Sequence, residues 1–161
     1  MINNKWDMLI AHPPCTYLSN AGACRLFPQK GHIDVERLKK GIQARDFFMR
    51  FLYADCERIA IENPRPLSVF CLPSHTAEIE PWQFGEPYTK HTLLWLKGLP
   101  PLIPTELCYD TRPYVSCGTS RNKGNADKAG VSRAGGAAKI RSKTFPGIAA
   151  AMAEQWGGDT V

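Results

Sequence analysis

Two short apolar runs and one long amphipathic segment set the order of the first elements. Residues 6–11 and 58–61 are apolar and end in proline-containing loops, a pattern typical of buried strands. Between them, residues 35–53 show helical periodicity, and Asp34 can cap that helix. The apolar positions that recur at helical spacing are Val35, Leu38, Ile42, Phe48, Met49 and Leu52. Strand, helix and strand in this order predict a βαβ unit with two parallel strands.

The rest of the chain extends this plan. A third strand is predicted at residues 92–96 and a last helix at about 146–155, whereas residues 15–33 and 66–87 read as loops. The positions of the last helix expected to face inward are Ile148 and Met152, with Ala149 and Ala153 as further candidates. The predicted fold is therefore α/β, a partial Rossmann-like and mostly parallel sheet flanked by helices, with its chemistry where strands end in loops.

Length and composition predict one soluble domain. The chain has 161 residues, of which 43% are hydrophobic and 22% charged, values that suit a single domain over residues 1–161. No apolar run approaches the roughly 20 residues that span a bilayer. The N-terminal residues show neither the apolar region nor the cleavage site of a signal peptide, so a cytoplasmic location is expected, with no membrane partner.

The cysteines are expected to be thiols, and no metal is expected. The six are Cys15, Cys24, Cys56, Cys71, Cys108 and Cys117. Without a secretion signal, free thiols are favoured over disulfides. No pair has the close spacing of a zinc or redox site. The candidate zinc ligands, at a spacing that matches no compact motif, are His12, Cys15, Cys24 and His32.

Positive charge is concentrated in a glycine-rich loop at about residues 111–143. This stretch holds eight basic residues and one acid, Asp127, in a chain whose net charge is +5. The residues expected to contact a polyanion such as DNA are Arg121, Lys123, Arg133, Lys139, Arg141 and Lys143. The alternative is a solvated loop whose charges keep the chain soluble.

Reactive side chains follow both of the first two strands. The first is followed by Pro13-Pro14-Cys15 and the second by Glu62-Asn63-Pro64. Because parallel neighbours present their carboxyl ends at one edge of a sheet, the thiol and the carboxyl group should converge there. Such a pair suits covalent catalysis on an electron-poor ring, with the thiolate adding to carbon and the acid holding a ring nitrogen.

Less specific interpretations exist for these residues. Cys15 could be a small buried apolar residue, and Glu62 could cap a turn. His12 could support the Cys15 loop, favour its thiolate or bond to the backbone.

These segments resemble the DNA cytosine-C5 methyltransferases. Pro13-Pro14-Cys15, followed by a loop that contains Ser19, is similar to their catalytic loop, and Glu62-Asn63-Pro64 is similar to their Glu-Asn-Val element. The chain resembles most closely the small methyltransferase-like proteins encoded by bacteriophages. The matching runs are residues 6–20, 61–64, 81–85, 94–100 and 141–149.

The resemblance implies a methyltransferase-type fold and a role for each matched residue. Cys15 would attack C6 of a cytosine swung out of the duplex, Glu62 would contact N3 and the exocyclic amine, and Asn63 would hold the loop that carries the acid. The methyl donor would be S-adenosylmethionine, with Pro13, Pro14 and Ser19 as candidate cofactor contacts.

The chain also departs from this family. Relatives begin with a further strand, glycine turn, helix and strand that bind S-adenosylmethionine, and that half has no counterpart here. The Gln-x-Arg-x-Arg element has only a loose counterpart at residues 88–92. A homodimer or a second chain could complete the sheet. The alternative function is a catalytically inactive phage protein that binds a nucleic acid or a nucleotide.

Overall fold

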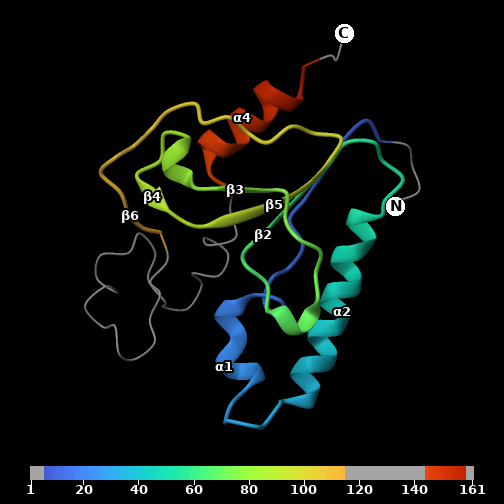
Figure 1. The fold of residues 1–161 in the computed structure, drawn as a ribbon. Helices are drawn as coiled ribbons and strands as arrows, with labels where there is room; N and C mark the ends of the chain where they lie inside the picture. Colours follow the sequence, from blue (N-terminus) through green and yellow to red (C-terminus); the bar gives the residue numbers. More distant parts are fainter. Residues whose placement is uncertain (1–5, 115–143, 159–161) are drawn as a thin grey trace. The chain divides into compact units, whose positions relative to one another are not determined.

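Each of the three predicted apolar runs contributes a strand to the main sheet, but the first contributes only Leu9–Ala11 and leaves Trp6 53% exposed. The computed structural model describes residues 6–114 and 144–158. It contains a four-stranded sheet in the order β1 (Leu9–Ala11), β2 (Ile59–Asn63), β5 (Thr92–Lys97) and β3 (Ala77–Ile79) (Figure 1). Residues Ile59 to Ile61 of β2 and Thr92 to Trp95 of β5 are buried. Continuous burial explains why these strands read as apolar runs rather than as alternating ones.

The sheet is mixed, because the pairings of β2 with its two neighbours run in opposite senses. β1 pairs with β2 in parallel, with Ala11 opposite Ile61, as the βαβ prediction requires. β2 pairs with β5 antiparallel, with Glu62 opposite Leu94. A parallel pairing needs a long crossover connection, which helix α2 (Val35–Leu52) supplies between β1 and β2. The chain between β2 and β5 contains no comparable helix. The α/β prediction is confirmed at this level.

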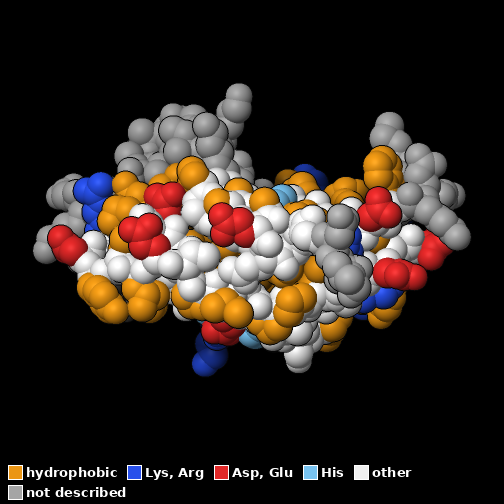
Figure 2. Space-filling model, turned by 90° about the horizontal axis from the view of Figure 1, so that it is seen from above, with side chains coloured by type: hydrophobic (Ala, Val, Ile, Leu, Met, Phe, Trp, Pro, Cys, Tyr) orange, Lys and Arg blue, Asp and Glu red, His pale blue; other side chains and the backbone are white. Residues whose placement is uncertain are grey.

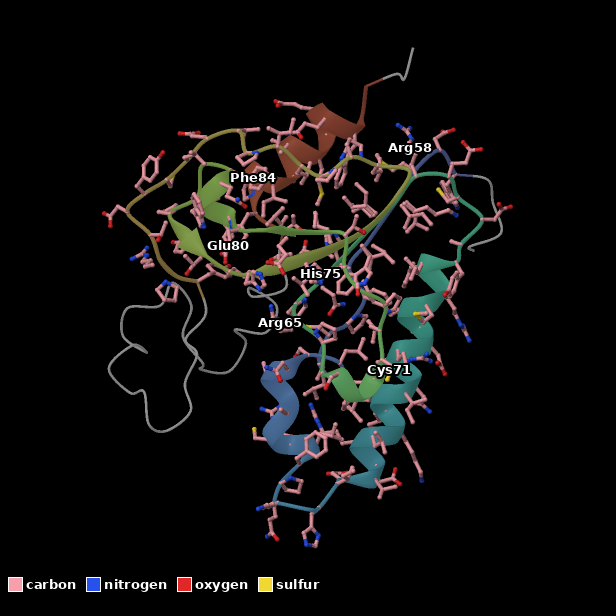
Figure 3. All side chains as sticks on the ribbon, in the orientation of Figure 1. Arg58, Arg65, Cys71, His75, Glu80 and Phe84 are labelled. Carbon is pink, nitrogen blue, oxygen red and sulfur yellow. The ribbon has the colours of Figure 1, made fainter. Side chains whose placement is uncertain are left out.

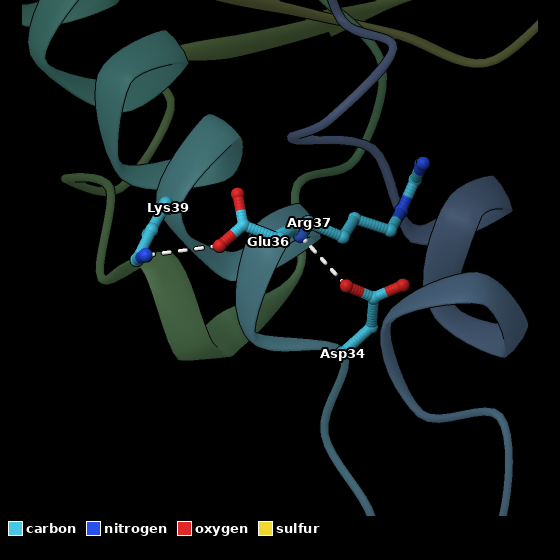
Figure 4. A network of polar contacts seen from close by, with 4 residues as sticks. All are labelled: Asp34, Glu36, Arg37 and Lys39. Carbon is cyan, nitrogen blue, oxygen red and sulfur yellow. Dashed lines mark hydrogen bonds and ion pairs between the residues drawn. The ribbon is translucent and has the colours of Figure 1, made fainter.

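Helix α2 begins where the sequence predicted. The backbone N–H of Arg37 donates to Oδ1 of the N-cap residue Asp34 at 2.9 Å, and Lys39 pairs with Glu36 at 2.9 Å (Figure 4). An acidic N-cap satisfies a backbone donor and suits the positive end of the helix dipole.

The buried face of α2 differs in part from the predicted one. Phe48 is fully buried and packs edge-to-face on Trp95, with ring centroids 5.0 Å apart. Val35 and Ile42, which belong to the apolar positions at helical spacing, are 59% and 46% exposed. The reason lies at Gly41, where an added Cβ would lie 2.2 Å from the ring of Phe70. This close approach turns the glycine face of the helix inward and leaves Val35 and Ile42 outside.

Short elements interrupt both predicted loops. Residues 15–33 contain the 3-10 helix η1 (Asn20–Gly22) and the short helix α1 (Ala23–Leu26). Residues 66–87 contain η2 (Ser68–Phe70), strand β3 and η3 (Pro81–Gln83). Turns this short bury few side chains, so they leave no periodic apolar pattern in the sequence.

The chain divides into two compact units. The first comprises residues 1–78 and 92–101, and the second residues 79–91 and 102–161. The second unit contains β4 (Tyr88–Thr89) paired in parallel with β6 (Arg112–Pro113), together with α4 (Pro146–Trp156). In α4, Ile148 and Met152 are buried as predicted. Ala149 and Ala153 are exposed, and Ala151 is buried instead, because the inward face follows Ile148, Ala151 and Met152.

Three aromatic rings form a cluster in the second unit. The rings of Tyr88, Tyr114 and Phe145 lie with centroids 4.6 to 5.9 Å apart. Lys90 Nζ lies 5.5 Å from the centroid of the Phe145 ring, and the Arg112 guanidinium lies 5.2 Å from that of Tyr88. Burial raises the pKa of Tyr114 above its ordinary value of 10.0, and Tyr88 and Glu86 add to the effect. We call the rings of Tyr88, Tyr114 and Phe145 the aromatic cluster.

The surface of the described residues carries acids, bases and apolar side chains together. The face shown in Figure 2 has acidic and apolar side chains intermingled. The most exposed large apolar side chains are Tyr109, Tyr53 and Ile103. Within residues 6–114 and 144–158, no helix is both long and apolar enough to cross a membrane.

Candidate active site

The carboxyl ends of β1 and β2 bring a histidine and a glutamate together. Because Ala11 is opposite Ile61 in the parallel register, the next residues, His12 and Glu62, are neighbours. His12 Nδ1 lies 3.0 Å from Glu62 Oε2, and their side chains are 40% and 14% exposed. Arg65 lies just beyond this end of β2, and Arg58 precedes the other end (Figure 3). The carboxyl group of Glu62 is thus largely buried beside an imidazole that reaches solvent.

The loops that follow these two strands are bonded to each other. We call residues 12–20 and 62–67 together the strand-end junction. The buried side-chain amide of Asn63 donates through Nδ2 to the carbonyl oxygen of Pro13 at 3.0 Å. Two backbone hydrogen bonds of 2.8 Å also join the loops, Asn20 N to Arg65 O and Leu67 N to Leu18 O. The loop that carries Cys15 is therefore fixed to the strand end that carries Glu62.

Cys15 begins a tight turn within this junction. Its carbonyl oxygen accepts hydrogen bonds from Leu18 N at 3.1 Å and from Ser19 N at 2.9 Å. Its side chain is neither fully buried nor fully exposed. Pro14 fixes the backbone dihedral φ just before the cysteine. Cys15 therefore lies on a rigid turn and is not enclosed in the apolar core.

Helix α2 supports the same loop from outside. The Arg37 guanidinium donates to the carbonyl oxygen of Thr16 at 2.8 Å and lies 5.0 Å from the centroid of the Tyr17 ring. Lys40 Nζ lies 5.8 Å from the same ring. An added Cβ at Gly22 would come within 2.7 Å of Arg37 Nη2, so this glycine gives the guanidinium its space. The path of the Cys15 loop is therefore fixed by contacts with helix α2 and with the end of strand β2.

The other described cysteines lie elsewhere. Cys56 is buried, and its thiol contacts the carbonyl oxygens of Trp6 and Arg58 at 3.3 and 3.2 Å, which fits a structural role. Cys24 and Cys71 are exposed, and Cys108 is partly exposed. Among the described residues, no three His, Cys, Asp or Glu side chains could hold a metal ion together. The alternative zinc site of His12, Cys15, Cys24 and His32 is therefore not formed.

Two of the three candidate contacts to S-adenosylmethionine are buried. Pro13 is buried, and its carbonyl oxygen accepts a hydrogen bond from Asn63. Ser19 is 8% exposed and forms an isolated β-bridge with Pro66. Only Pro14 is exposed, and it has no backbone N–H. S-adenosylmethionine carries an amino-acid group, a ribose and an adenine that all need polar partners. The one exposed side chain among the three residues is that of Pro14, which is apolar, and their role as cofactor contacts stays a prediction.

The predicted nucleic-acid contacts lie outside the described residues. They are Arg121, Lys123, Arg133, Lys139, Arg141 and Lys143.

The pairing of His12 with Glu62 was missed by the sequence analysis, which linked His12 to Cys15 or to the backbone. The signal was present in the chain. Each of the two residues follows the apolar run of a predicted parallel strand at about the same offset, so neighbouring strands place them side by side.

No protein-family model matches the chain, and comparisons with curated proteins and with solved structures also give no match.

Proposed function

We propose that the chain is a DNA cytosine-C5 methyltransferase-like protein in which Cys15 is the nucleophile and Glu62 binds the base. One observation carries this proposal, namely that the Cys15 loop and the Glu62 strand end are bonded together at one edge of the sheet. The partly exposed thiol and the largely buried carboxyl group are the two groups that addition to a pyrimidine ring requires.

The chemistry proposed for these residues begins with the thiolate of Cys15, whose proton has passed to solvent. Its sulfur forms a bond to C6 of cytosine, and the electron pair of the C5–C6 double bond moves away from C6 to make C5 nucleophilic. Glu62, as a carboxylic acid, donates a hydrogen bond to N3 and accepts one from the exocyclic amine. The withdrawal of electrons through N3 makes C6 easier to attack. Asn63 holds the two loops together while this occurs.

The methyl donor of this proposal is S-adenosylmethionine, which supplies the methyl group that C5 would receive. Because Pro13 and Ser19 are buried, we propose that a second chain or residues outside the described ranges would supply most of its binding site. A target base in duplex DNA would have to leave the stack to reach Cys15.

A hydrogen-exchange experiment tests the proposal without any cofactor. After sulfur adds to C6, C5 can take a proton from solvent. Loss of the original C5 hydrogen and expulsion of the thiolate then restore cytosine. In heavy water the wild-type chain should therefore place deuterium at C5 of cytosine in single-stranded DNA, as measured by mass spectrometry of the nucleosides.

Two cysteine variants control this experiment. Cys15→Ser should lower the exchange rate by more than about a thousandfold, since loss of a catalytic nucleophile costs at least this much. Cys24→Ser, at an exposed thiol outside the strand-end junction, should exchange at the wild-type rate. Equal exchange in Cys15→Ser and wild type would refute the role of Cys15, and no exchange in the wild type would refute the proposed chemistry.

The burial of Pro13 and Ser19 favours a second candidate, a binding protein without catalysis. It would bind a nucleic acid or a nucleotide through the basic residues of the 111–143 segment. Binding would then weaken as salt rises, survive Cys15→Ala, and weaken further when Arg133, Lys139 and Arg141 are neutralised. Binding that is indifferent to salt and to these charges would exclude it.

A further inference from the structure

The contact between His12 and Glu62 is a feature that the proposed chemistry does not yet use. His12 is the residue directly before Pro13-Pro14-Cys15, and its Nδ1 reaches across to the neighbouring strand. Strand β2 itself is buried on both sides of this point, with Ile61 fully buried and Asn63 2% exposed. Glu62 is thus the ionisable side chain of a buried strand end, and an imidazole lies against it.

This contact favours one orientation of the Glu62 carboxyl group. Nδ1 lies 3.0 Å from Oε2, and rotation about the bond between Cγ and Cδ would move Oε2 away from the imidazole. The other oxygen then also has a preferred direction. A carboxyl group that must donate to one base atom and accept from its neighbour works only in one rotational setting, because hydrogen bonds weaken steeply when misaligned.

The position of the histidine is itself fixed by the fold. Two prolines follow it, and the first is bonded through its carbonyl oxygen to Asn63 on the same strand as Glu62. His12 and Glu62 are also neighbours in the β1–β2 register. The strand register and the hydrogen bond to Pro13 therefore keep the backbone of His12 beside that of Glu62.

We propose that His12 is a positioning residue that holds the Glu62 carboxyl group in the orientation needed to bind N3 and the exocyclic amine of cytosine. This inference rests on the proposed function and adds a residue to it. His12 acts through Glu62 and does not itself touch the base.

Three substitutions at position 12 separate positioning from packing. Asparagine carries its amide nitrogen at about the place of Nδ1, so His12→Asn places a donor beside Oε2. Glutamine carries its amide one bond further out, at about the place of Nε2, and alanine has no donor. The three side chains therefore differ in where a donor lies, and asparagine and glutamine are alike in polarity.

The readout is the rate of deuterium exchange at C5, measured over a range of DNA concentration. His12→Ala and His12→Gln should lower the rate at saturating DNA by roughly ten- to a hundredfold, the cost of misplacing a catalytic group by about 1 Å. The half-saturating DNA concentration should change by less than about threefold, because the contact matters most in the adduct. His12→Asn should stay within about threefold of the wild-type rate.

A second histidine–glutamate pair provides the matched control. His75 Nε2 lies 2.8 Å from Glu78 Oε1, and His75 stands outside the strand-end junction (Figure 3). His75→Ala removes a comparable pair and should leave the exchange rate unchanged. Thermal unfolding of every variant shows whether a loss of rate reflects a loss of fold. The comparison of His12→Asn with His12→Gln stays informative even where His12→Ala fails to fold.

The outcomes separate this inference from the proposed function. No exchange by the wild-type chain would overturn both. Exchange by the wild type with an unchanged rate in His12→Ala and His12→Gln would overturn only the role of His12. Equal loss in His12→Asn and His12→Gln would also overturn it, because a donor at the Nδ1 position would then not be what Glu62 requires.

Discussion

The strand-end junction and the aromatic cluster are held together by different kinds of contact. In the junction, two loops are joined by backbone hydrogen bonds and by one buried amide, that of Asn63. In the cluster, rings from three segments far apart in the sequence, at residues 88, 114 and 145, pack on one another. Backbone hydrogen bonds survive most side-chain changes, whereas each ring of the cluster depends on the other two. The junction should therefore tolerate substitution better than the cluster.

The largest effect on stability is expected in the cluster. Phe145→Ala should lower the free energy of unfolding by about 3–5 kcal/mol, since this ring is 7% exposed and contacts two others. Urea unfolding measures the change. Tyr109→Ala is the control, because Tyr109 is 83% exposed and its loss should cost less than about 0.5 kcal/mol. Equal effects of the two substitutions would show that the cluster does not hold the second unit together.

A glycine in the first unit tests close packing there. Gly41→Ala should destabilise the chain by about 1–3 kcal/mol, because the new methyl group would overlap the buried ring of Phe70. The better helix propensity of alanine, about 1 kcal/mol, would offset part of this cost. Unfolding by urea gives the difference. A variant more stable than wild type would mean that Phe70 moves away without cost.

The buried amide of the junction should affect activity more than fold. Asn63→Ala removes the hydrogen bond to Pro13 and should cost about 1–3 kcal/mol of stability. It should also lower the rate of C5 exchange, because the Cys15 loop loses its bond to the Glu62 strand. Asn20→Ala keeps its backbone bond to Arg65 and is the control for both measurements. An unchanged exchange rate in a folded Asn63→Ala would show that the loop holds its place without this bond.

The smallest expected effect is a dependence of stability on pH in the cluster. The folded-state pKa of Tyr114 is raised above 10.0, so above about pH 10 the unfolded chain loses this proton more readily than the folded one. Stability should therefore be full below pH 10 and should fall as pH rises towards the folded pKa. In Tyr114→Phe this part of the decline should disappear. Unfolding is measured between pH 9 and 11. If the stability of Tyr114→Phe declined as steeply as that of the wild type, the raised pKa of Tyr114 would not be the cause.

The contrast between the two regions also explains what the sequence could predict. β1, β2 and α2 were predictable because apolar runs and helical spacing report burial directly, and Asp34 marks a helix start. The junction followed from a topological rule, since a βαβ unit brings two strand ends together. The exposure of Val35 and Ile42 was not predictable, because it depends on the approach of Phe70 to Gly41.

The aromatic cluster and the antiparallel strand β5 lay beyond sequence reasoning for a related reason. Neither Tyr88 nor Phe145 lies in a periodic apolar pattern, so nothing local indicates that their rings meet. The direction of β5 depends on the path of the whole connection from residue 64 to residue 91. Within the site, the pairing of His12 with Glu62 was indicated by their equal offsets from two predicted parallel strands, whereas the contact between Nδ1 and Oε2 depends on side-chain conformation.

The most direct test of the central claim, that Cys15 adds to a pyrimidine ring, is a covalent capture experiment. The chain is incubated with single-stranded DNA that contains 5-azacytosine, whose ring is more electron-poor than cytosine and can take a proton at N5 once sulfur has added to C6. Mass spectrometry of the digested product should show the modified base on the peptide that contains Cys15 and on no other cysteine. Modification of Cys24 or Cys71 to the same extent, or no adduct at all, would contradict the account.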